Sequence, residues 1–277
     1  MDHATAHMLI DLTSDFYRRV SASFSETRQA AWAGWQHACD VCADACHPAM
    51  RVLDLGCGNL RFERFLMQSI GGFGEAYAFD NCEELTREGK RQLEGEGASV
   101  FLHHLNIAQA LMSASEGAAG DAARNAAEDT VGNTAETSLD LGVSPCDLSV
   151  AFGFAHHLPT FGMRACMLRT LVSHTRPGGY VIVSFWQFAH DDKLRAKAER
   201  ATERGCTELG ITLGAGDYLL GWQSEQHLYR FCHHFEDAEI DQLAQAVGTS
   251  AVEVARFSAD GKTGNLNRYL ILHAEEA

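Results

Sequence analysis

The stretch VLDLGCGNLRF, from Val52 to Phe62, decides the fold of this chain. Its apolar start predicts a buried strand, and its glycines predict a tight turn that leads into a helix. A dinucleotide-binding turn has glycines spaced G-x-G-x-x-G, so that a pyrophosphate can approach the helix. Gly56 and Gly58 are present, but Arg61 stands where the third glycine belongs. The turn therefore favours a nucleoside ligand without phosphates over NAD.

The same alternation of strand and helix continues along the chain. Further strands are expected at 75–79, 99–103, 147–154 and 180–186. Residues 252–257 and 268–273 flank an Asp-Gly turn region and predict a hairpin. The predicted fold class is α/β: a Rossmann-like open sheet of seven strands, mostly parallel, with helices on both faces and a C-terminal antiparallel hairpin.

The composition narrows the function classes. The net charge of −15 argues against tight, non-specific DNA or RNA binding, because general nucleic-acid binders are usually basic. No apolar run reaches the roughly eighteen residues of a membrane span, and the first residues lack the basic and apolar parts of a signal peptide. We therefore expect a cytoplasmic protein whose nine cysteines are mostly reduced.

Three of these cysteines lie close together in the stretch CDVCADAC: Cys39, Cys42 and Cys46. This spacing places them on one face of a helix, where cysteine packs as a small apolar side chain. The alternative is part of a metal site, but zinc needs a fourth ligand from elsewhere. We favour the buried helix face and predict no metal.

Polar and small residues follow the ends of the predicted strands. In an open α/β sheet the ligand binds at the carboxyl ends of the strands, where strand order reverses. Those ends carry residues 54–58, Asp80, Asn106, 153–157 and Trp186. Asp80 lies 22 residues after the last glycine of the turn, and an acid there accepts hydrogen bonds from both hydroxyls of a ribose. An adenosine-containing ligand is therefore expected.

The glycine turn resembles the first motif of class I S-adenosylmethionine-dependent methyltransferases, roughly D-x-G-x-G-x-G. Asp54, Gly56 and Gly58 match it, while Leu60 stands where the family usually has glycine. The resemblance implies S-adenosylmethionine as methyl donor, with an acid on the ribose and two residues flanking the adenine, Asn106 and Ile107. The positions implied to contact the cofactor are Tyr17, Arg28, Asp54, Gly56, Cys57, Gly58, Asp80, Asn81, Asn106, Ile107 and Gly153.

Three further stretches, 16–32, 217–222 and 229–235, resemble the methyltransferases that esterify 5-carboxymethyluridine at the wobble position of tRNA. Cys232 replaces an aromatic residue of that family's pattern. The strand end at 151–158, with its His-His pair, is also similar. The matching positions are Tyr17, Phe24, Ser25, Thr27, Arg28, Trp32, Asp217, Trp222, Arg230, Phe231 and His233.

The length of 277 residues suits a single methyltransferase domain. Residues 12–46 are expected to be helical, and the insertion at 113–146 to be mobile, because it is rich in small residues and carries six Asp and Glu against one Arg. At most one weak helix is expected there, at 118–127. The expected parts are a helical cap at 1–50, a cofactor-binding core at 51–186, and substrate-side helices with the hairpin at 187–277.

The second resemblance implies a carboxylate as methyl acceptor. A carboxylate is ionised at neutral pH, so catalysis depends on aligning it with the methyl group. Arg230 is the expected catalytic clamp, since a guanidinium binds a carboxylate through two parallel hydrogen bonds. His157 and His233 are expected to hydrogen-bond the substrate or, for a phenol or amine, to act as base. Trp186, Trp222 and Arg230 are the expected substrate contacts.

Several alternatives stay open. The acceptor is either tRNA or a small-molecule acid, phenol or amine, and the acidic net charge is the main objection to tRNA. The departures at Leu60 and Asn106 also suit a protein that binds the cofactor without catalysis. Arg230 is alternatively a surface ion-pair partner of Glu225 or Glu236. The resemblance further allows a small activating partner protein.

Overall fold

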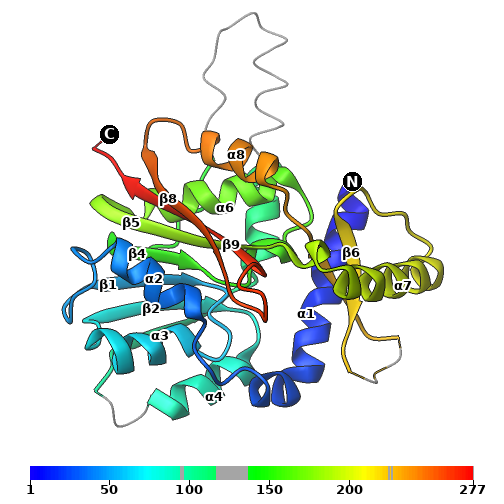
Figure 1. Cartoon of the computed structure of the whole chain (residues 1–277), viewed down its shortest axis with the longest axis horizontal. Coiled ribbons are helices and arrows are strands. Elements are labelled where there is room, and N and C mark those ends of the chain that lie inside the picture. The colour runs from blue at the N-terminus through cyan, green and yellow to red at the C-terminus, as the bar shows by residue number, and fades with distance from the viewer. Residues whose placement is uncertain (94–96, 117–136, 224, 226, 277) are drawn as a thin grey trace, which may run out of the picture.

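The computed structural model describes residues 1–93, 97–116, 137–223, 225 and 227–276. Its centre is a seven-stranded sheet with the order β3-β2-β1-β4-β5-β9-β8 (Figure 1). The first five strands in the chain pair in parallel, while β9 is antiparallel to both β5 and β8. The predicted fold class is confirmed. The strands are β1 (Arg51–Leu55), β2 (Glu75–Asp80), β3 (Val100–His104), β4 (Cys146–Ala151), β5 (Thr175–Trp186), β8 (Ala251–Ala259) and β9 (Asn267–Ala274).

Helices cover both faces of this sheet. On one face, α6 and α8 pack with the helical residues 107–116 in a large apolar cluster. On the other face, α2 and α3 pack around the buried Trp35. The helices are α1 (His3–Glu26), α2 (Ala33–Val41), α3 (Arg61–Phe65), α4 (Glu83–Leu93), α6 (Phe161–Ser173), α7 (Asp192–Leu209) and α8 (Asp237–Gln245). A π-helical turn (Leu66–Ile70) follows α3.

The N-terminal cap is two helices rather than the single helical stretch expected at 12–46. α1 ends at Glu26 and α2 begins at Ala33. Side chains that follow the glycine turn hold the link between them: Asn59 donates to the carbonyl of Arg28 at 3.2 Å, and Arg61 donates to the carbonyl of Ala30 at 3.2 Å. The break therefore brings the cap onto the glycine turn.

A second, two-stranded antiparallel sheet was not expected from the sequence. It consists of β6 (Asp217–Gly221) and β7 (Tyr229–His233), and it lies between α1 and α7 (Figure 1). All five residues of β7 are buried, including Arg230 and His233. Because both faces are covered, the strand shows no polar alternation by which to recognise it.

Three smaller expectations need correction or restriction. β5 starts at Thr175, ahead of the expected 180, and its pairing with β4 shifts register near Pro177. Of the expected insertion, residues up to 116 are helical, and Leu139 and Leu141 pack on the core, so these parts are not a mobile loop. The weak helix expected at 118–127 lies outside the described residues.

The three cysteines pack against the apolar core as predicted, but not on one helix face, because α2 ends at Val41 and only Cys39 lies within it. Cys39 and Cys42 are buried against Trp35, and Cys46, beyond the end of α2, is partly buried against the same cluster. Across the described residues, no helix combines the length and the hydropathy that a membrane span requires.

Candidate active site

A cavity of about 480 Å³ lies at the carboxyl ends of the parallel strands. It is bounded by the glycine turn, by the link between α1 and α2, and by one face of β7. Its lining includes these residues predicted from the sequence: Tyr17, Arg28, Asp54, Gly56, Cys57, Gly58, Asp80, Asn81, Asn106, Ile107, Gly153, His157, Trp186 and Arg230. The structure therefore brings together fourteen positions from seven separate parts of the chain.

The glycine turn has the backbone that its sequence requires. Gly56 has φ +78°, and a Cβ there would lie 2.8 Å from Phe154, so only glycine fits. Gly58 has φ +54°, but a Cβ there would meet nothing within 4 Å, which leaves open space above the turn. Leu60 also takes a left-handed conformation, with φ +55°. The missing glycine of the motif therefore changes the residue but keeps the turn.

Asp80 connects the end of β2 to this turn. One carboxylate oxygen accepts from the Gly58 N–H at 2.9 Å, and the other accepts from the Cys82 N–H at 2.8 Å. Burial raises the pKa of Asp80, although these backbone donors oppose that shift. Each oxygen keeps a further lone pair, so the carboxylate can still accept from the two hydroxyls of a ribose.

Ser14 joins α1 to the end of the cavity predicted for adenine. Its hydroxyl accepts from the side-chain amides of Asn81, at 2.8 Å, and Asn106, at 3.5 Å. The Asn106 carbonyl oxygen accepts from the Gln109 N–H at 3.1 Å, so it also caps the helical residues 107–116. Ser14 was not predicted, since nothing in a helical stretch marks one serine as facing a distant strand end.

A chain of hydrogen bonds crosses the opposite end of the cavity. Arg230 Nη1 donates to the Tyr17 hydroxyl at 3.1 Å, and this hydroxyl lies 2.8 Å from His157 Nε2. His157 Nδ1 lies 2.8 Å from the carbonyl oxygen of Phe231. Because a carbonyl only accepts, Nδ1 carries the proton and Nε2 accepts from Tyr17. Both nitrogens of His157 are therefore engaged, and its ring orients Tyr17.

The charge states along this chain follow from burial. Burial, together with the nearby Arg230 charge, lowers the pKa of His157 to about 3. Burial raises the pKa of Tyr17 to about 12. At neutral pH the imidazole and the phenol are both neutral, and the guanidinium is the charged member of the chain.

Arg230 is only 7% exposed. Within the described part of the chain it has no carboxylate partner, and its Nε is buried without a hydrogen bond. Its guanidinium instead lies over the rings of Phe16, Tyr17, Trp186 and Trp222, at 4.9 to 6.0 Å from their centroids. The surface ion pair considered from the sequence is therefore wrong.

Two predicted site residues do not line the cavity. His233 is buried, with Nδ1 2.7 Å from Asp217 and Nε2 2.7 Å from Glu239, so neither nitrogen is available to a substrate. Trp222 packs against Phe16 and Phe24, and its indole donates to Ser23. We therefore correct both predictions: His233 stabilises the fold, and Trp222 supports the wall behind Arg230.

Besides Ser14, three residues that line the cavity or lie next to its lining were not predicted as functional residues: His156, Asp260 and Glu63. His156 lines the cavity with a buried, unpartnered Nδ1, and burial lowers its pKa well below the ordinary value. Asp260, at the tip of the β8–β9 hairpin, accepts from the Gly34 N–H and from Tyr269 and Asn267. Glu63 is fully buried next to Asp54. The His-His pair at the end of β4 was the one local signal for His156, whereas Asp260 and Glu63 act through tertiary contacts that no local pattern records.

A family model described as a methyltransferase domain matches residues 24–254. The chain belongs to this methyltransferase family. The match spans the glycine turn, the parallel strands and Arg230, and it confirms the predicted class I S-adenosylmethionine-dependent methyltransferase. A search of curated protein sequences gave no significant match.

Solved structures of methyltransferases share the fold. An S-adenosylmethionine-dependent methyltransferase from Methanosarcina mazei is 16% identical, with a TM-score of 0.57, over 84% of this chain and 97% of that one. The magnesium protoporphyrin IX methyltransferase of Synechocystis, with bound S-adenosylhomocysteine, is 15% identical, with a TM-score of 0.55, over 96% and 99%. A complex of the Haloferax volcanii Trm112 methyltransferase activator with a methyltransferase matches at 11% identity and a TM-score of 0.54, over 96% and 98%.

The residues of the cavity fit the cofactor of this methyltransferase. Space above Gly58 is open, Asp80 offers free lone pairs for a ribose, and Asp54 faces the cavity between the strand ends. Arg28 and Arg230 supply cations at the far end, and burial together with the Arg230 charge lowers the pKa of Arg28. The cavity therefore offers Asp80 to the ribose of S-adenosylmethionine, Asp54 to the ammonium of its amino-acid part, and an arginine to its carboxylate.

Proposed function

We propose that this methyltransferase transfers the methyl group of S-adenosylmethionine to a carboxylate, forming a methyl ester. The observation that carries the proposal is Arg230, a buried guanidinium that faces the cavity with no carboxylate partner among the described residues. A buried charge without a counter-charge is costly, so its retention in a binding cavity favours an anionic ligand. The planar guanidinium suits the two oxygens of a carboxylate.

Two arginines at one end of the cavity support two anionic groups. Arg28 lines the same end, and the Arg230 charge lowers its pKa, so the two cations oppose each other in the free protein. The cofactor supplies one carboxylate in its methionine part. A second carboxylate, from the acceptor, balances the remaining charge.

The acceptor end also lacks an obvious general base. Both nitrogens of His157 are engaged, and burial lowers the pKa of His156 so far that its neutral imidazole is a weak base. A carboxylate acceptor needs no base because it is already ionised. The protein then holds the acceptor oxygen in line with the sulfur-bound methyl group. Arg230 binds the acceptor carboxylate, and Tyr17 and His157 hold Arg230 in position. The four aromatic rings over Arg230, which we call the aromatic wall, exclude water. The cofactor supplies an activated methyl group on a cationic sulfur.

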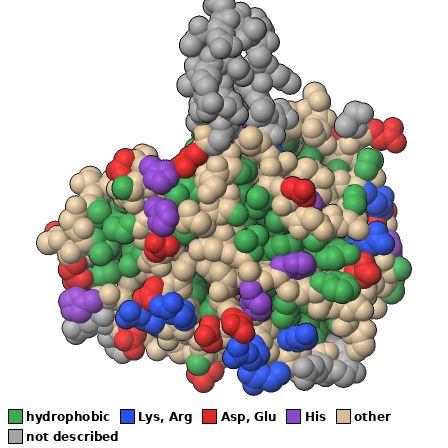
Figure 2. All heavy atoms as spheres, turned by 180° about the vertical axis from the view of Figure 1, so that it is seen from behind, with side chains coloured by type: hydrophobic (Ala, Val, Ile, Leu, Met, Phe, Trp, Pro, Cys, Tyr) green, Lys and Arg blue, Asp and Glu red, His purple; other side chains and the backbone are tan. Residues whose placement is uncertain are grey.

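For the natural acceptor we propose 5-carboxymethyluridine of tRNA, on the sequence resemblance, with a small-molecule acid as second candidate. The net charge of −15 favours the second. On the face in Figure 2, cationic side chains gather near the lower edge beside acidic ones, without a broad positive field. The Haloferax complex contains a methyltransferase activator, and we propose that a partner of that kind adds cationic surface for tRNA to that of this chain.

The test is a transfer assay with methyl-labelled S-adenosylmethionine. One reaction receives bulk tRNA, and the other receives a cell extract passed through a small-pore size filter. Label that is released from tRNA by mild base, as a methyl ester should be, supports the first candidate. Base-labile label in the filtrate alone supports the small-molecule acid.

Two matched variants distinguish loss of the carboxylate contact at Arg230 from a non-specific loss of folding or activity. Arg230→Ala should lower the rate at which base-labile label forms by about a hundredfold or more, whereas Arg87→Ala, at an exposed arginine on α4, should leave it unchanged. Base-stable label would overturn carboxylate methylation and point to a nitrogen or hydroxyl acceptor. Tight cofactor binding without label in either reaction, also after addition of a candidate activator, would favour a protein that binds the cofactor without catalysis.

A further inference from the structure

Glu63 is a buried acid that the proposed methyl transfer does not use. It lies in α3, the helix after the glycine turn, with no exposed surface, and it adjoins Asp54 at the end of β1. Asp54 Oδ1 and both carboxyl oxygens of Glu63 are buried without a hydrogen-bond donor. Two carboxyl groups thus face each other, Asp54 in the lining of the cofactor cavity and Glu63 buried behind it.

Two ionised carboxylates in contact accept hydrogen bonds but cannot donate one, so without a proton they only repel. A proton on one of them supplies the missing donor and removes one buried charge. Burial, followed by the charge of Glu63, raises the pKa of Asp54 well above its usual value, and burial raises the pKa of Glu63 to about 7. In such a pair the titration belongs to both groups together.

The neighbouring charges leave this arrangement in place. Asp80, from β2, adds a negative charge that raises the pKa of Asp54 further, and the Cys57 thiol stays neutral because burial raises its pKa. Arg64, on α3, lowers the pKa of Glu63, but its Nη1 donates to Gln29 and Gln92. Asp54 Oδ1 and the two carboxyl oxygens of Glu63 keep no hydrogen-bond partner among the described residues.

We propose that Glu63 is a positioning residue that shares a proton with Asp54, so that binding of the cofactor's amino-acid part expels one proton from the pair into solvent. The proposal rests on S-adenosylmethionine being the cofactor. The ammonium of the methionine part favours an ionised Asp54, because opposite charges at close range attract. Below the pKa of Glu63 the pair carries two protons, so the loss of one on binding leaves a shared proton through which Glu63 holds Asp54 in place. Cofactor affinity is therefore expected to rise with pH across neutrality.

Calorimetric titration of the purified full chain with two ligands tests this. S-adenosylhomocysteine carries the amino-acid part, and 5′-methylthioadenosine carries the same nucleoside without it. S-adenosylhomocysteine should bind about tenfold more weakly at pH 6 than at pH 8, as release of one proton from a group with pKa near 7 requires. Methylthioadenosine should change less than twofold, which also controls for Asp80 on the ribose.

Glu63→Gln is the matched variant, because its amide still donates to Asp54 but has no proton to release. Its affinity for S-adenosylhomocysteine should vary less than twofold over the same pH range. Wild-type titrations in phosphate and Tris, whose ionisation enthalpies differ, count the released protons without any variant: close to one at pH 6 and close to none at pH 8.

The outcomes are distinct. S-adenosylhomocysteine binding that does not depend on pH, or an equal pH dependence in Glu63→Gln or with methylthioadenosine, overturns the shared proton while the cofactor assignment stands. Failure of S-adenosylhomocysteine to bind at pH 8 overturns both the cofactor and this inference. A pH dependence seen only when Glu63 and the amino-acid part are both present supports the inference.

Discussion

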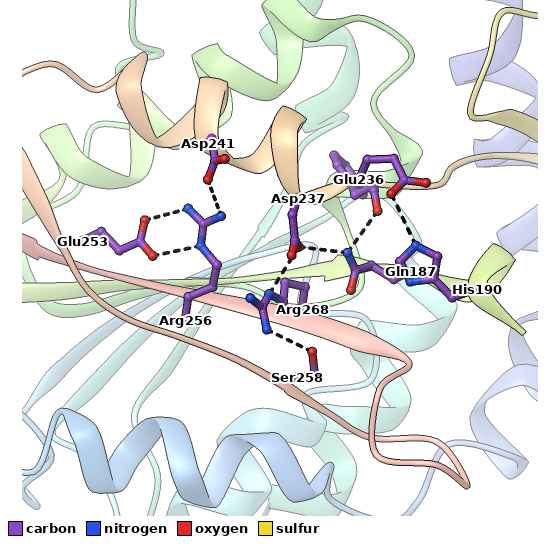
Figure 3. A network of polar contacts seen from close by, with 10 residues as sticks. Gln187, His190, Glu236, Asp237, Asp241, Glu253, Arg256, Ser258 and Arg268 are labelled. Carbon is purple, nitrogen blue, oxygen red and sulfur yellow. Dashed lines mark hydrogen bonds and ion pairs between the residues drawn. The ribbon is translucent and has the colours of Figure 1, made fainter.

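Two arginines on different sheets of the fold have opposite surroundings. Arg256, on β8, donates through Nε and Nη2 to Glu253 at 2.8 and 2.6 Å and through Nη1 to Asp241 at 2.5 Å (Figure 3). Arg268 beside it reaches Asp237 and Ser258. Arg230, on β7, has the neutral hydroxyl of Tyr17 and four aromatic rings instead.

The difference separates arginines whose charge is balanced by acids of the protein from an arginine whose charge would be balanced by a bound ligand. The network in Figure 3 ties α8 to the hairpin, with an acid for each arginine. At the cavity, a guanidinium that is more deeply buried lacks that acid among the described residues. A folded protein keeps such an imbalance where binding restores the charge.

Truncating the two arginines should therefore have opposite consequences. Arg230→Ala should lower kcat/KM for the carboxylate acceptor by about 10²- to 10³-fold, because a buried charge pair with the substrate is lost. Its free energy of unfolding should not fall, since a buried unpaired charge is removed. Arg256→Ala should keep kcat/KM within about twofold and lower the free energy of unfolding by about 1 kcal/mol, because its partners are partly exposed.

Steady-state kinetics measure the change in kcat/KM of both variants, and urea titrations measure the change in their free energy of unfolding. Arg230→Lys is the further control: it keeps the charge but loses the planar pair of donors, and it should recover little activity. Equal losses of activity in Arg230→Ala and Arg256→Ala would mean that Arg230 acts through the fold rather than on the acceptor.

Tyr17→Phe probes how the unpaired guanidinium is held. The variant removes the acceptor for Arg230 and the donor to His157 Nε2. We expect kcat/KM to fall about ten- to a hundredfold, because a hydrogen bond to a charged group is lost in a buried site. Tyr218→Phe, at a tyrosine outside the cavity lining, is the control. An unchanged rate in Tyr17→Phe would show that the aromatic wall alone positions Arg230.

His233 extends the comparison to a buried cation that is paired. Burial opposes its charge, but hydrogen bonds to Asp217 and Glu239 raise its pKa. A pKa raised by folding means that protonation favours the folded state, so the contribution is complete below the ordinary value of 6.5 and disappears as pH rises through the folded pKa. His233→Gln should cost about 1–2 kcal/mol of unfolding free energy at pH 6 and less at pH 9.

Urea titrations at the two pH values measure this, with the exposed His227→Gln as control. A cost for His233→Gln that grows with pH would contradict the ion-paired state. Loss of cofactor binding in a folded His233→Gln protein would mean that His233 contributes to the active site and not only to folding.

The sequence revealed the cofactor end of the site better than the acceptor end, and the reason is physical. Asp54, Gly56 and Gly58 act through local backbone geometry, which short-range spacing records. Arg230 and His233 lie on a strand that is buried on both faces, so no alternation of polar and apolar residues marks it as a strand. Successive strand residues face opposite sides, so residues three apart cannot share a cavity. Recognising β7 as a strand would have separated Arg230 from His233.

Tertiary contacts account for the other gaps. Ser14 meets Asn81 and Asn106 only because α1 crosses the strand ends, and Glu63 meets Asp54 only because α3 turns back onto β1. No pattern within a window of sequence contains such meetings. The two-helix cap has the same cause, since Asn59 and Arg61 hold the break from a distance in sequence.

Replacing Leu60 tests whether the glycine turn depends on its backbone conformation or on the side chain buried beneath it. It is the departure from the methyltransferase motif, and its φ of +55° costs a non-glycine residue about 1 kcal/mol. Its side chain is fully buried with Cys57, Ala78 and Leu93, which contributes about 2 kcal/mol. Leu60→Gly relieves the strain but loses the burial and adds backbone entropy to the unfolded chain, so the free energy of unfolding should fall by about 1–2 kcal/mol.

Affinity for S-adenosylhomocysteine should stay within about twofold in Leu60→Gly, because the turn keeps its conformation and the open space above Gly58 is unchanged. Thermal unfolding and calorimetric titration of the variant measure the two effects. A more stable Leu60→Gly protein would mean that the strain of the turn exceeds the apolar contribution. A large change in affinity would mean that Leu60 shapes the cofactor cavity rather than filling the core beneath it.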